Sequence, residues 1–279
     1  MTTVGYGDLS PSTGAGRAVA VVLMVAGIGS VSMLTALVAS ALIERRLRHN
    51  RGMETYELEQ HIVISEWNPR AREILREIRS DRRAATAAVV LIADLPEKPV
   101  ADPHLYFVRG TVDEETLRRA GVAGAATVVI LGDDGLDIVA RDARAVLAAL
   151  TVESINREVY TIVELVDAAN VQFCERANVD EVIVASEFNS MLLSRAALDH
   201  GVSKVVSDLL STRRGHNLAK IPTPDTLVGA HFFDAFCQLK QAQNSIVLGV
   251  QQAAGGKVIS NPPADYEIHA GDMLIVVME

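Results

Sequence analysis

The run AVAVVLMVAGIGSVSMLTALVASALI at residues 18–43 contains no charged side chain, and Arg17 and Glu44 bound it. As a helix this run extends about 39 Å, enough to cross a hydrocarbon core of about 30 Å. The alternatives are a signal peptide and a buried helix of a soluble protein. A buried helix of this length would be unusual in a chain of ordinary size, and the apolar segment of a signal peptide has only about 7–15 residues and follows a basic start. Residues 1–16 contain no Lys or Arg. The run therefore predicts a transmembrane helix over residues 18–43.

The charge of the chain lies on one side of this helix. Residues 44–51 read ERRLRHNR, and their four arginines mark the cytoplasmic end of the span. The 279-residue chain has a net charge of −9, and Asp8 and Arg17 are the charged residues before Glu44. The positive mean hydropathy of +0.22 is thus an average of an apolar span and an acidic body. The acidic balance argues against nucleic acid as a partner. Two cysteines, Cys174 and Cys237, suit a reducing cytosol.

A second motif, T-V-G-Y-G, stands about ten residues before the predicted helix, at Thr3, Val4, Gly5, Tyr6 and Gly7. It resembles the selectivity filter of potassium channels, in which backbone carbonyls replace the water shell of K⁺. The alternating glycines permit backbone torsions that a Cβ would oppose. Four chains would complete each ring of oxygens. An ordinary glycine-rich turn is the alternative, and the position ahead of a membrane helix favours the filter.

A pore also needs an outer helix and a short pore helix ahead of its filter, because a lone filter strand leaves backbone groups unpaired at membrane depth. We therefore expect Met1 to be internal to a longer native protein. Gly27 and Gly29, in the middle of the span, suit either a gating hinge or close packing between helices. The residues alone leave both readings open.

Beyond a charged linker at residues 44–60, short apolar runs alternate with helical patterns. The strands are expected at 61–65, 87–93, 105–108, 127–131, 160–163 and 182–185, and the helices at 70–78, 114–120, 137–150, 170–177 and 191–198. Such alternation predicts an α/β domain with a doubly wound parallel sheet, a Rossmann-like arrangement. From about residue 207 the long helical crossovers stop. Strands at 219–222, 245–251, 257–259 and 273–278 with a helix at 232–240 predict a small α+β domain.

Ligands of doubly wound sheets bind at the carboxyl ends of the strands, where the first turn carries G-x-G-x-x-G in dinucleotide sites. Here this turn reads E-W-N-P-R-A at residues 66–71, and Glu66 would repel a phosphate. Asp94, after the second strand, is the one residue that fits the acidic group of a ribose site. A dehydrogenase site is therefore not expected, no catalytic constellation is visible, and the chain is predicted not to be an enzyme. Glu66, Asn68 and Asp94 are the candidate residues for a regulatory ligand.

The order of these parts resembles bacterial and archaeal potassium channels with cytosolic RCK domains of the TrkA-N and TrkA-C type. The parts are a filter and outer loop at 1–17, an inner helix at 18–43, a linker at 44–60, a Rossmann-like domain with crossover helices at 61–206 and a C-terminal domain at 207–279. The segments that carry the resemblance are TVGYGD at 3–8, GIG at 27–29, HIVISEWN at 61–68, PPADY at 262–266 and AGD at 270–272.

This resemblance implies K⁺-selective passive transport across the cell membrane, with residues 44–279 in the cytoplasm. It implies a homotetrameric pore in the lipid bilayer, gated by a ring of RCK domains that is usually an octamer, and it tips Gly27 and Gly29 toward a hinge. Each chain supplies one RCK unit, so a soluble copy started at Met53, or a second unit beyond Glu279, would complete such a ring. The gating ligand stays open between a nucleotide and a divalent cation.

This chain differs from the calcium-gated members of the family in its carboxylates, and one alternative function has to be weighed. Those relatives place carboxylates beyond the fourth and fifth strands; Glu164 matches, whereas Gly132 and Val166 occupy the other positions. Glu164 is thus the candidate Ca²⁺ ligand that matches those relatives. The adjacent Asp133, Asp134 and Asp167 would have to replace the missing carboxylates, and solvated acidic loops are the alternative interpretation of these three residues. The alternative function is a membrane-tethered regulator of a separate potassium transporter, which would leave the filter motif unexplained.

Overall fold

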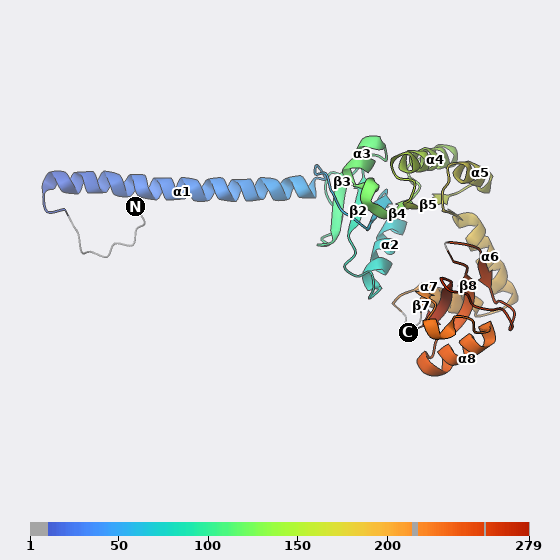
Figure 1. Ribbon diagram of the computed structural model, residues 1–279. Helices are drawn as coiled ribbons and strands as arrows, with labels where there is room; N and C mark the ends of the chain where they lie inside the picture. Colours follow the sequence, from blue (N-terminus) through green and yellow to red (C-terminus); the bar gives the residue numbers. More distant parts are fainter. Residues whose placement is uncertain (1–10, 214–216, 254, 279) are drawn as a thin grey trace.

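The computed structural model describes residues 11–213, 217–253 and 255–278. The predicted filter, Thr3 to Gly7, lies outside these residues. The described chain consists of a long N-terminal helix and two lobes, each with its own sheet (Figure 1).

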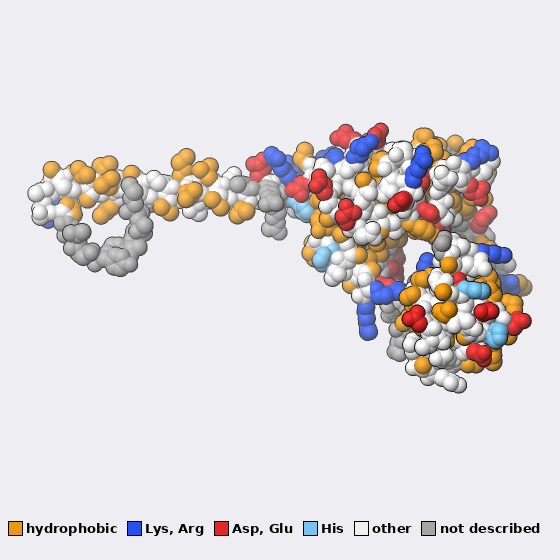
Figure 2. Space-filling model, in the orientation of Figure 1, with side chains coloured by type: hydrophobic (Ala, Val, Ile, Leu, Met, Phe, Trp, Pro, Cys, Tyr) orange, Lys and Arg blue, Asp and Glu red, His pale blue; other side chains and the backbone are white. Residues whose placement is uncertain are grey.

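The N-terminal helix, α1 (Gly14–Asn50), contains 37 residues and projects from the body beside strand β3 (Leu105–Arg109) (Figure 1). An 18-residue window within its segment Gly14–Ser40 has a mean hydropathy of 2.3, and only 6% of that window is buried. Hydrophobic side chains accordingly cover its surface (Figure 2). An apolar helix without protein cover is stable in lipid or against sister helices. The structure thus supports the predicted span and extends the helix beyond residue 43.

Local hydrogen bonds make this helix compatible with a membrane. Thr13 caps its start by accepting a hydrogen bond from the Gly16 amide at 3.1 Å. Within the apolar segment, the hydroxyls of Ser30 and Thr35 donate to carbonyls four residues earlier, at 2.7 and 2.9 Å. These polar groups are therefore satisfied inside the helix, where no water is present.

The N-terminal lobe is built on a six-stranded parallel sheet with the order β3-β2-β1-β4-β5-β6. The strands are β1 (His61–Ser65), β2 (Val89–Ala93), β3, β4 (Ala125–Ile130), β5 (Tyr160–Leu165) and β6 (Glu181–Val184). The helices are α2 (Pro69–Ser80), α3 (Glu114–Arg119), α4 (Ile138–Ile155) and α5 (Val171–Arg176), with short 3-10 turns at Val122–Gly124 and Ala168–Asn170.

Each face of this sheet has its own apolar core because the strands carry apolar residues on both sides. Ala71 and Leu75 of α2 pack with Ile64 on one face. Leu117 of α3 and Ala145 of α4 pack on the other. Helices thus cover both faces, and the predicted doubly wound, Rossmann-like sheet is confirmed.

Two helices, α6 (Ala185–Leu198) and α7 (Val202–Leu210), lead to the C-terminal lobe. That lobe is a four-stranded antiparallel sheet in the order β7-β10-β8-β9, which differs in kind from the first sheet and confirms the small α+β domain. Its elements are β7 (Asn217–Pro222), a 3-10 turn (Asp225–Leu227), α8 (Phe232–Gln243), β8 (Ile246–Gln251), β9 (Val258–Ser260) and β10 (Met273–Met278). Phe232 and Leu239 of α8 pack on Leu274 to form the core.

Candidate regulatory site and pore junction

The first turn of the parallel sheet, between β1 and α2, has the backbone shape of a glycine turn without a glycine. Glu66 has φ +64°, the left-handed region that glycine adopts most easily. Asn68 then caps α2, because its side-chain oxygen accepts a hydrogen bond from the Ala71 amide at 2.9 Å. Its side-chain amide donates to the Gly132 carbonyl at 3.1 Å, which joins this turn to the one after β4.

Charged side chains from both turns, from the helices α2 and α4 that follow them, and from strand β5 meet at this edge of the sheet. We call them the charge cluster: Glu66, Arg70, Asp133, Asp134, Arg141, Arg144 and Glu164. Arg70 lies 2.7 Å from Asp134 and 2.9 Å from Glu164. Arg141 lies 3.0 and 3.4 Å from the same two carboxylates.

The remaining pairs of the cluster centre on Arg144, which lies 3.1 Å from Asp133 and 3.7 Å from Glu66. Burial raises the pKa of Glu66, and the Arg144 charge acts against that rise. For Arg70, burial lowers the pKa, but the hydrogen bond and charge of Asp134 and the charge of Glu164 raise it overall. Each of the four carboxylates in the cluster is thus paired with at least one of the three arginines, and the formal charge of the cluster is negative by one carboxylate.

The cluster fills the place where a doubly wound sheet usually binds its ligand. A Cβ at Gly132 would collide with the Arg141 side chain, so the glycine makes room for this arginine. The cavity left between Glu66, Asp133, Arg141 and Arg144 measures only about 10 Å³. The edge is thus closed by the protein's own ion pairs.

The structure brings three of the four predicted site residues together. Glu66 and Glu164 belong to the charge cluster, and Asn68 joins its two turns. Asp94 lies at the rim, where its side chain is 67% exposed and 3.6 Å from Arg109. Glu164, the candidate Ca²⁺ ligand, is held by two arginines and by the Gly132 amide at 3.2 Å. Among the described residues, no three His, Cys, Asp or Glu side chains are grouped as a metal site.

The three arginines were missed at the level of sequence. One signal was available for Arg70, which stands in the first turn of α2. A cation is unfavourable there, because the helix dipole presents positive charge at this end. Its presence indicates a compensating carboxylate nearby. Arg141 and Arg144 carry no comparable signal.

The second functional feature is the junction between α1 and the body. The Asn50 carbonyl accepts a hydrogen bond from the Lys98 amide at 2.8 Å, and the Gly52 carbonyl accepts one from the Arg109 amide at 2.9 Å. The Arg119 guanidinium donates to the same Gly52 oxygen at 2.5 Å. The end of the helix is therefore bound to the β2–β3 side of the sheet by backbone and side-chain contacts.

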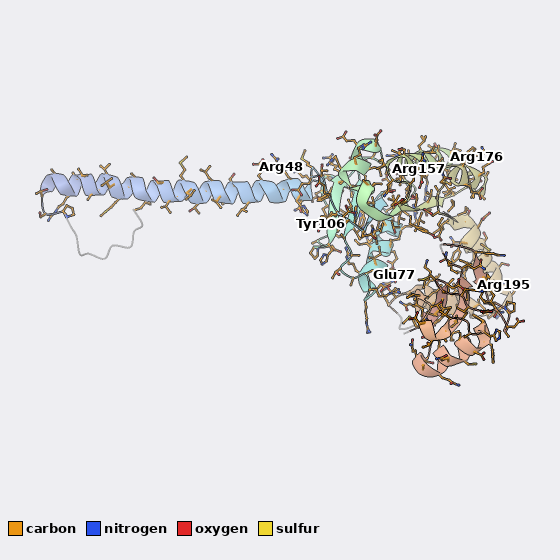
Figure 3. All side chains as sticks on the ribbon, in the orientation of Figure 1. Arg48, Glu77, Tyr106, Arg157, Arg176 and Arg195 are labelled. Carbon is orange, nitrogen blue, oxygen red and sulfur yellow. The ribbon has the colours of Figure 1, made fainter. Side chains whose placement is uncertain are left out.

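Gly52 fits this junction because it has φ +66° and a Cβ there would lie 2.5 Å from the Arg109 nitrogen. Tyr56 continues the contact, since its hydroxyl donates to the Phe107 carbonyl at 3.3 Å and its ring meets Tyr106 edge to face at 5.1 Å. Figure 3 shows Tyr106 at this end of the body. The residues predicted as a linker are thus partly helix and partly docked chain.

An apolar helix long enough to cross a membrane, continuous with a Rossmann-like lobe and a small antiparallel lobe, is the arrangement expected of a membrane protein with a cytoplasmic regulatory part. Comparison with protein families agrees along the chain. Residues 1–44 match an ion channel family, residues 57–163 match the calcium-activated potassium channel slowpoke-like RCK domain, and residues 186–279 match the Castor and Pollux family, part of voltage-gated ion channels.

Two curated relatives are similar over nearly the whole chain. The calcium-gated potassium channel TvoK of Thermoplasma volcanium is 30% identical over 279 residues, which cover 99% of this chain and 78% of the relative. The putative potassium channel protein YugO of Bacillus subtilis is 30% identical over 284 residues, covering 99% of this chain and 83% of the relative. The human SLO3 gating ring shares the fold, with a TM-score of 0.60 and 14% identity over 79% of this chain and 44% of that one.

The chain belongs to the family of potassium channels that carry a cytosolic RCK domain. It is a subunit of a ligand-regulated potassium channel, with K⁺ as the permeant ion, and works in the membrane as part of an oligomer. Its families and relatives are ion channels and not enzymes. Both predictions, of channel function and of membrane location, are confirmed.

Proposed function

We propose that four copies of this chain line one pore, in which Thr3, Val4, Gly5, Tyr6 and Gly7 select K⁺. The observation that carries the proposal is the continuity of α1. The helix runs unbroken from the apolar segment through Gly27 and Gly29 to the docked residues Asn50 and Gly52. A movement of the cytosolic lobe is therefore delivered to the membrane segment by a stiff element and not by a flexible tether.

Gly27 and Gly29 are the proposed hinge of this element. A Cβ at Gly29 would meet no atom within 4 Å in the described chain, so no contact inside the chain requires a glycine there. A helix bends most easily where side chains are absent. The straight α1 of this structure then represents one of two shapes between which the pore switches.

The cytosolic lobes present two unpartnered apolar surfaces, which we propose as contacts between copies of this chain. One lies on α4, where Val139 (78% exposed), Leu147 and Leu150 recur at helical spacing. The other is the α6–α7 pair, which has no buried residue and exposes Met191, Leu193 and others. Apolar surfaces of this kind mark interaction sites.

Two separate surfaces on the cytosolic body of each chain are what a closed ring requires. If each surface pairs with the same surface of another copy, the two contacts alternate around the ring and the number of copies is even. A tetrameric pore contributes four copies. Four further copies, for which an internal start at Met53 is one source, would give the proposed octamer.

We propose the charge cluster as the regulatory site, closed by its own ion pairs when no ligand is bound. A divalent cation would bind to the carboxylates of Glu164 and Asp134 and break their ion pairs with the arginines. A nucleotide phosphate would instead bind to the arginines and displace the carboxylates. Ca²⁺ is the first ligand to test because the similar TvoK is calcium-gated. Either ligand shifts gating only if the open and closed rings bind it unequally.

K⁺ flux from liposomes containing the native protein tests this function. We expect K⁺-selective flux over Na⁺ that changes when Ca²⁺, NADH or ADP is added. Absence of K⁺-selective flux under all these conditions would contradict the pore proposal. If none of the three ligands changes the K⁺ flux, and none raises or lowers the unfolding temperature of the protein, the regulatory site alone would be contradicted.

A further inference from the structure

The two cytosolic lobes are fastened together at the end of α2. The Glu77 carboxylate accepts hydrogen bonds from the Thr212 amide at 2.9 Å and from the Thr212 hydroxyl at 2.7 Å. Arg213 reaches the same carboxylate at 2.9 Å and Glu73 at 2.5 Å. Figure 3 shows Glu77 on the side of the first lobe that faces the second. We call these contacts the seam.

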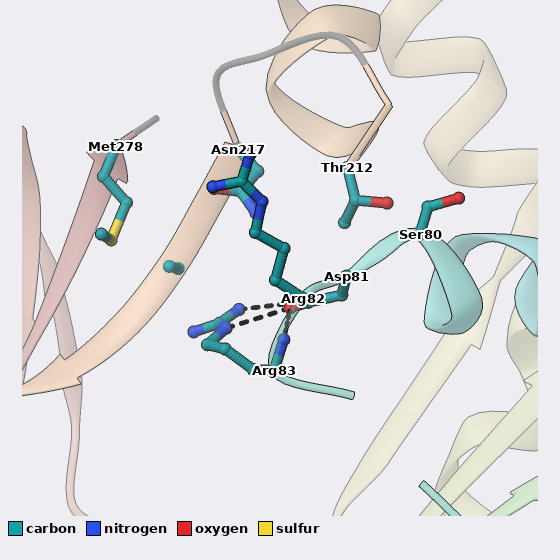
Figure 4. A pocket seen from close by; sticks show the side chains of 8 residues that line it. Ser80, Asp81, Arg82, Arg83, Thr212, Asn217 and Met278 are labelled. Atoms are coloured by element: carbon teal, nitrogen blue, oxygen red, sulfur yellow. Dashed lines mark hydrogen bonds and ion pairs between the residues drawn. The ribbon is translucent and has the colours of Figure 1, made fainter. Parts of the chain in front are cut away.

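A pocket of about 510 Å³ opens beside the seam, and both lobes line it (Figure 4). The N-terminal lobe contributes Ser80, Asp81, Arg82 and Arg83 to its lining. The C-terminal lobe and the segment that leads into it contribute Thr212, Asn217, Ala219 and Met278. The volume lies within the range of small-molecule sites, about 300–1,000 Å³. A molecule bound there touches both lobes at once.

The charges of this pocket select an anion. The Asp81 carboxylate is already used, since Arg83 binds it through Nη2 at 2.9 Å, Nε at 3.2 Å and the backbone amide at 2.8 Å. This hydrogen bonding lowers the pKa of Asp81. Arg82 makes no hydrogen bond or ion pair within the part of the chain that the structure describes, and extends across the pocket toward Asn217 (Figure 4). Among the described residues that line the pocket, one arginine is thus unpaired and the one carboxylate, Asp81, is neutralised.

We propose that this pocket binds a small phosphate monoester that bridges the two lobes. Arg82 binds the phosphate, since a guanidinium presents paired N–H groups that match phosphate oxygens. The Asn217 side-chain amide supplies a further donor. Ala219 and Met278 form an apolar wall for the organic part. Because the ligand holds both lobes, it stabilises one arrangement of them, and this regulatory consequence rests on the proposed channel function.

Isothermal titration of the native protein at fixed ionic strength tests the site, with adenosine 5′-monophosphate and ribose 5-phosphate as probes and adenosine as the uncharged control. We expect at least one phosphate ester to bind at least about 10-fold more tightly than adenosine, and Arg82→Gln to remove that advantage. Arg157→Gln, which removes an exposed arginine outside the pocket, should leave binding unchanged. Failure of both esters to bind, or equal binding by Arg82→Gln, would overturn the proposal.

K⁺ flux with the same esters separates this inference from the channel function. We expect the bound ester to change flux in the native protein but not in Arg82→Gln. Binding without any change in flux would overturn the regulatory role of the pocket. Loss of K⁺ selectivity would instead count against the pore itself.

Discussion

Glu66 shows how one residue can keep a backbone shape while changing its chemistry. The turn after β1 still has the left-handed conformation at this position, with φ +64°. A side chain in this region costs about 1 kcal/mol or more. The carboxylate that replaces the glycine then pairs with Arg144 and helps to close the edge of the sheet.

Glu66→Gly should therefore be more stable than Glu66→Ala by about 1 kcal/mol, because only the glycine relieves the strain of the left-handed backbone. Glu66→Ala is the matched control, since it also removes the carboxylate but keeps a Cβ. Denaturant unfolding of the two variants measures the difference. Equal stability of the glycine and alanine variants would show that the backbone is not strained there.

Gly52 is the corresponding residue at the junction, where a Cβ would lie 2.5 Å from the Arg109 nitrogen. We expect Gly52→Ala to lower the free energy of unfolding by more than about 1 kcal/mol and to weaken the docking of α1. Gly229 has φ +82° with no atom within 4 Å of its Cβ position, so Gly229→Ala carries only the backbone cost. The junction variant should be the less stable of the two in thermal unfolding, and the reverse order would contradict the crowded geometry.

At the scale of elements, the seam between α2 and the second lobe should depend on pH through Glu77. Its burial raises the pKa, but hydrogen bonds from Thr212 and the Arg213 charge lower it overall. A lowered pKa means that the ionised form stabilises the folded state above the unfolded pKa of about 4.5, and that this stability is lost as pH falls through the folded value.

Glu77→Gln should reduce stability near pH 7 by about 1 kcal/mol and flatten the decline in stability below about pH 5. The exposed Glu57, which has no partner within the described residues, supplies the control Glu57→Gln. Thermal unfolding at a series of pH values measures both. An acid decline in Glu77→Gln as steep as in the unmodified protein would rule out this role of the seam.

The elements themselves were largely readable from the sequence. β1 (His61–Ser65) and β10 (Met273–Met278) have the bounds that were expected from the sequence. Helix α6 starts six residues earlier than the expected residue 191, because Val184 passes directly from strand to helix without a breaker. α1 continues through charged residues, where Glu44 and Arg48 pair at 2.8 Å one helical turn apart.

The candidate site was only half readable for a different reason. The carboxylates and the first turn were visible because each stands at the end of an apolar strand or directly after one. Their arginine partners lie on α2 and α4, and the pairing of Arg70 with Glu164 depends on how two βα units sit side by side. The pocket beside the seam depends on the contact of two lobes. Residue patterns along one element carry no information on either arrangement.

At the scale of the whole molecule, the two apolar surfaces make a testable prediction about assembly. A buried aspartate is costly at an apolar contact, so Val139→Asp on α4 and Leu193→Asp on α6 should each break one type of contact. We expect smaller assemblies in both variants by light scattering of the protein in detergent. Val258→Asp, on the short strand β9, is the control for an added charge. Unchanged mass in both helix variants would contradict the ring.

The central claim is that the cytosolic body controls the pore through the stiff junction after α1. Single-channel recording tests it most directly with three forms of the native channel: unmodified, carrying a twelve-residue Gly-Ser insert after Asn50, and ending at Asn50. A flexible insert transmits little force. We expect the same K⁺ selectivity in all three forms. The open probability of the insert form should equal that of the shortened form and differ from that of the unmodified channel. An open probability of the insert form equal to that of the unmodified channel would contradict the claim.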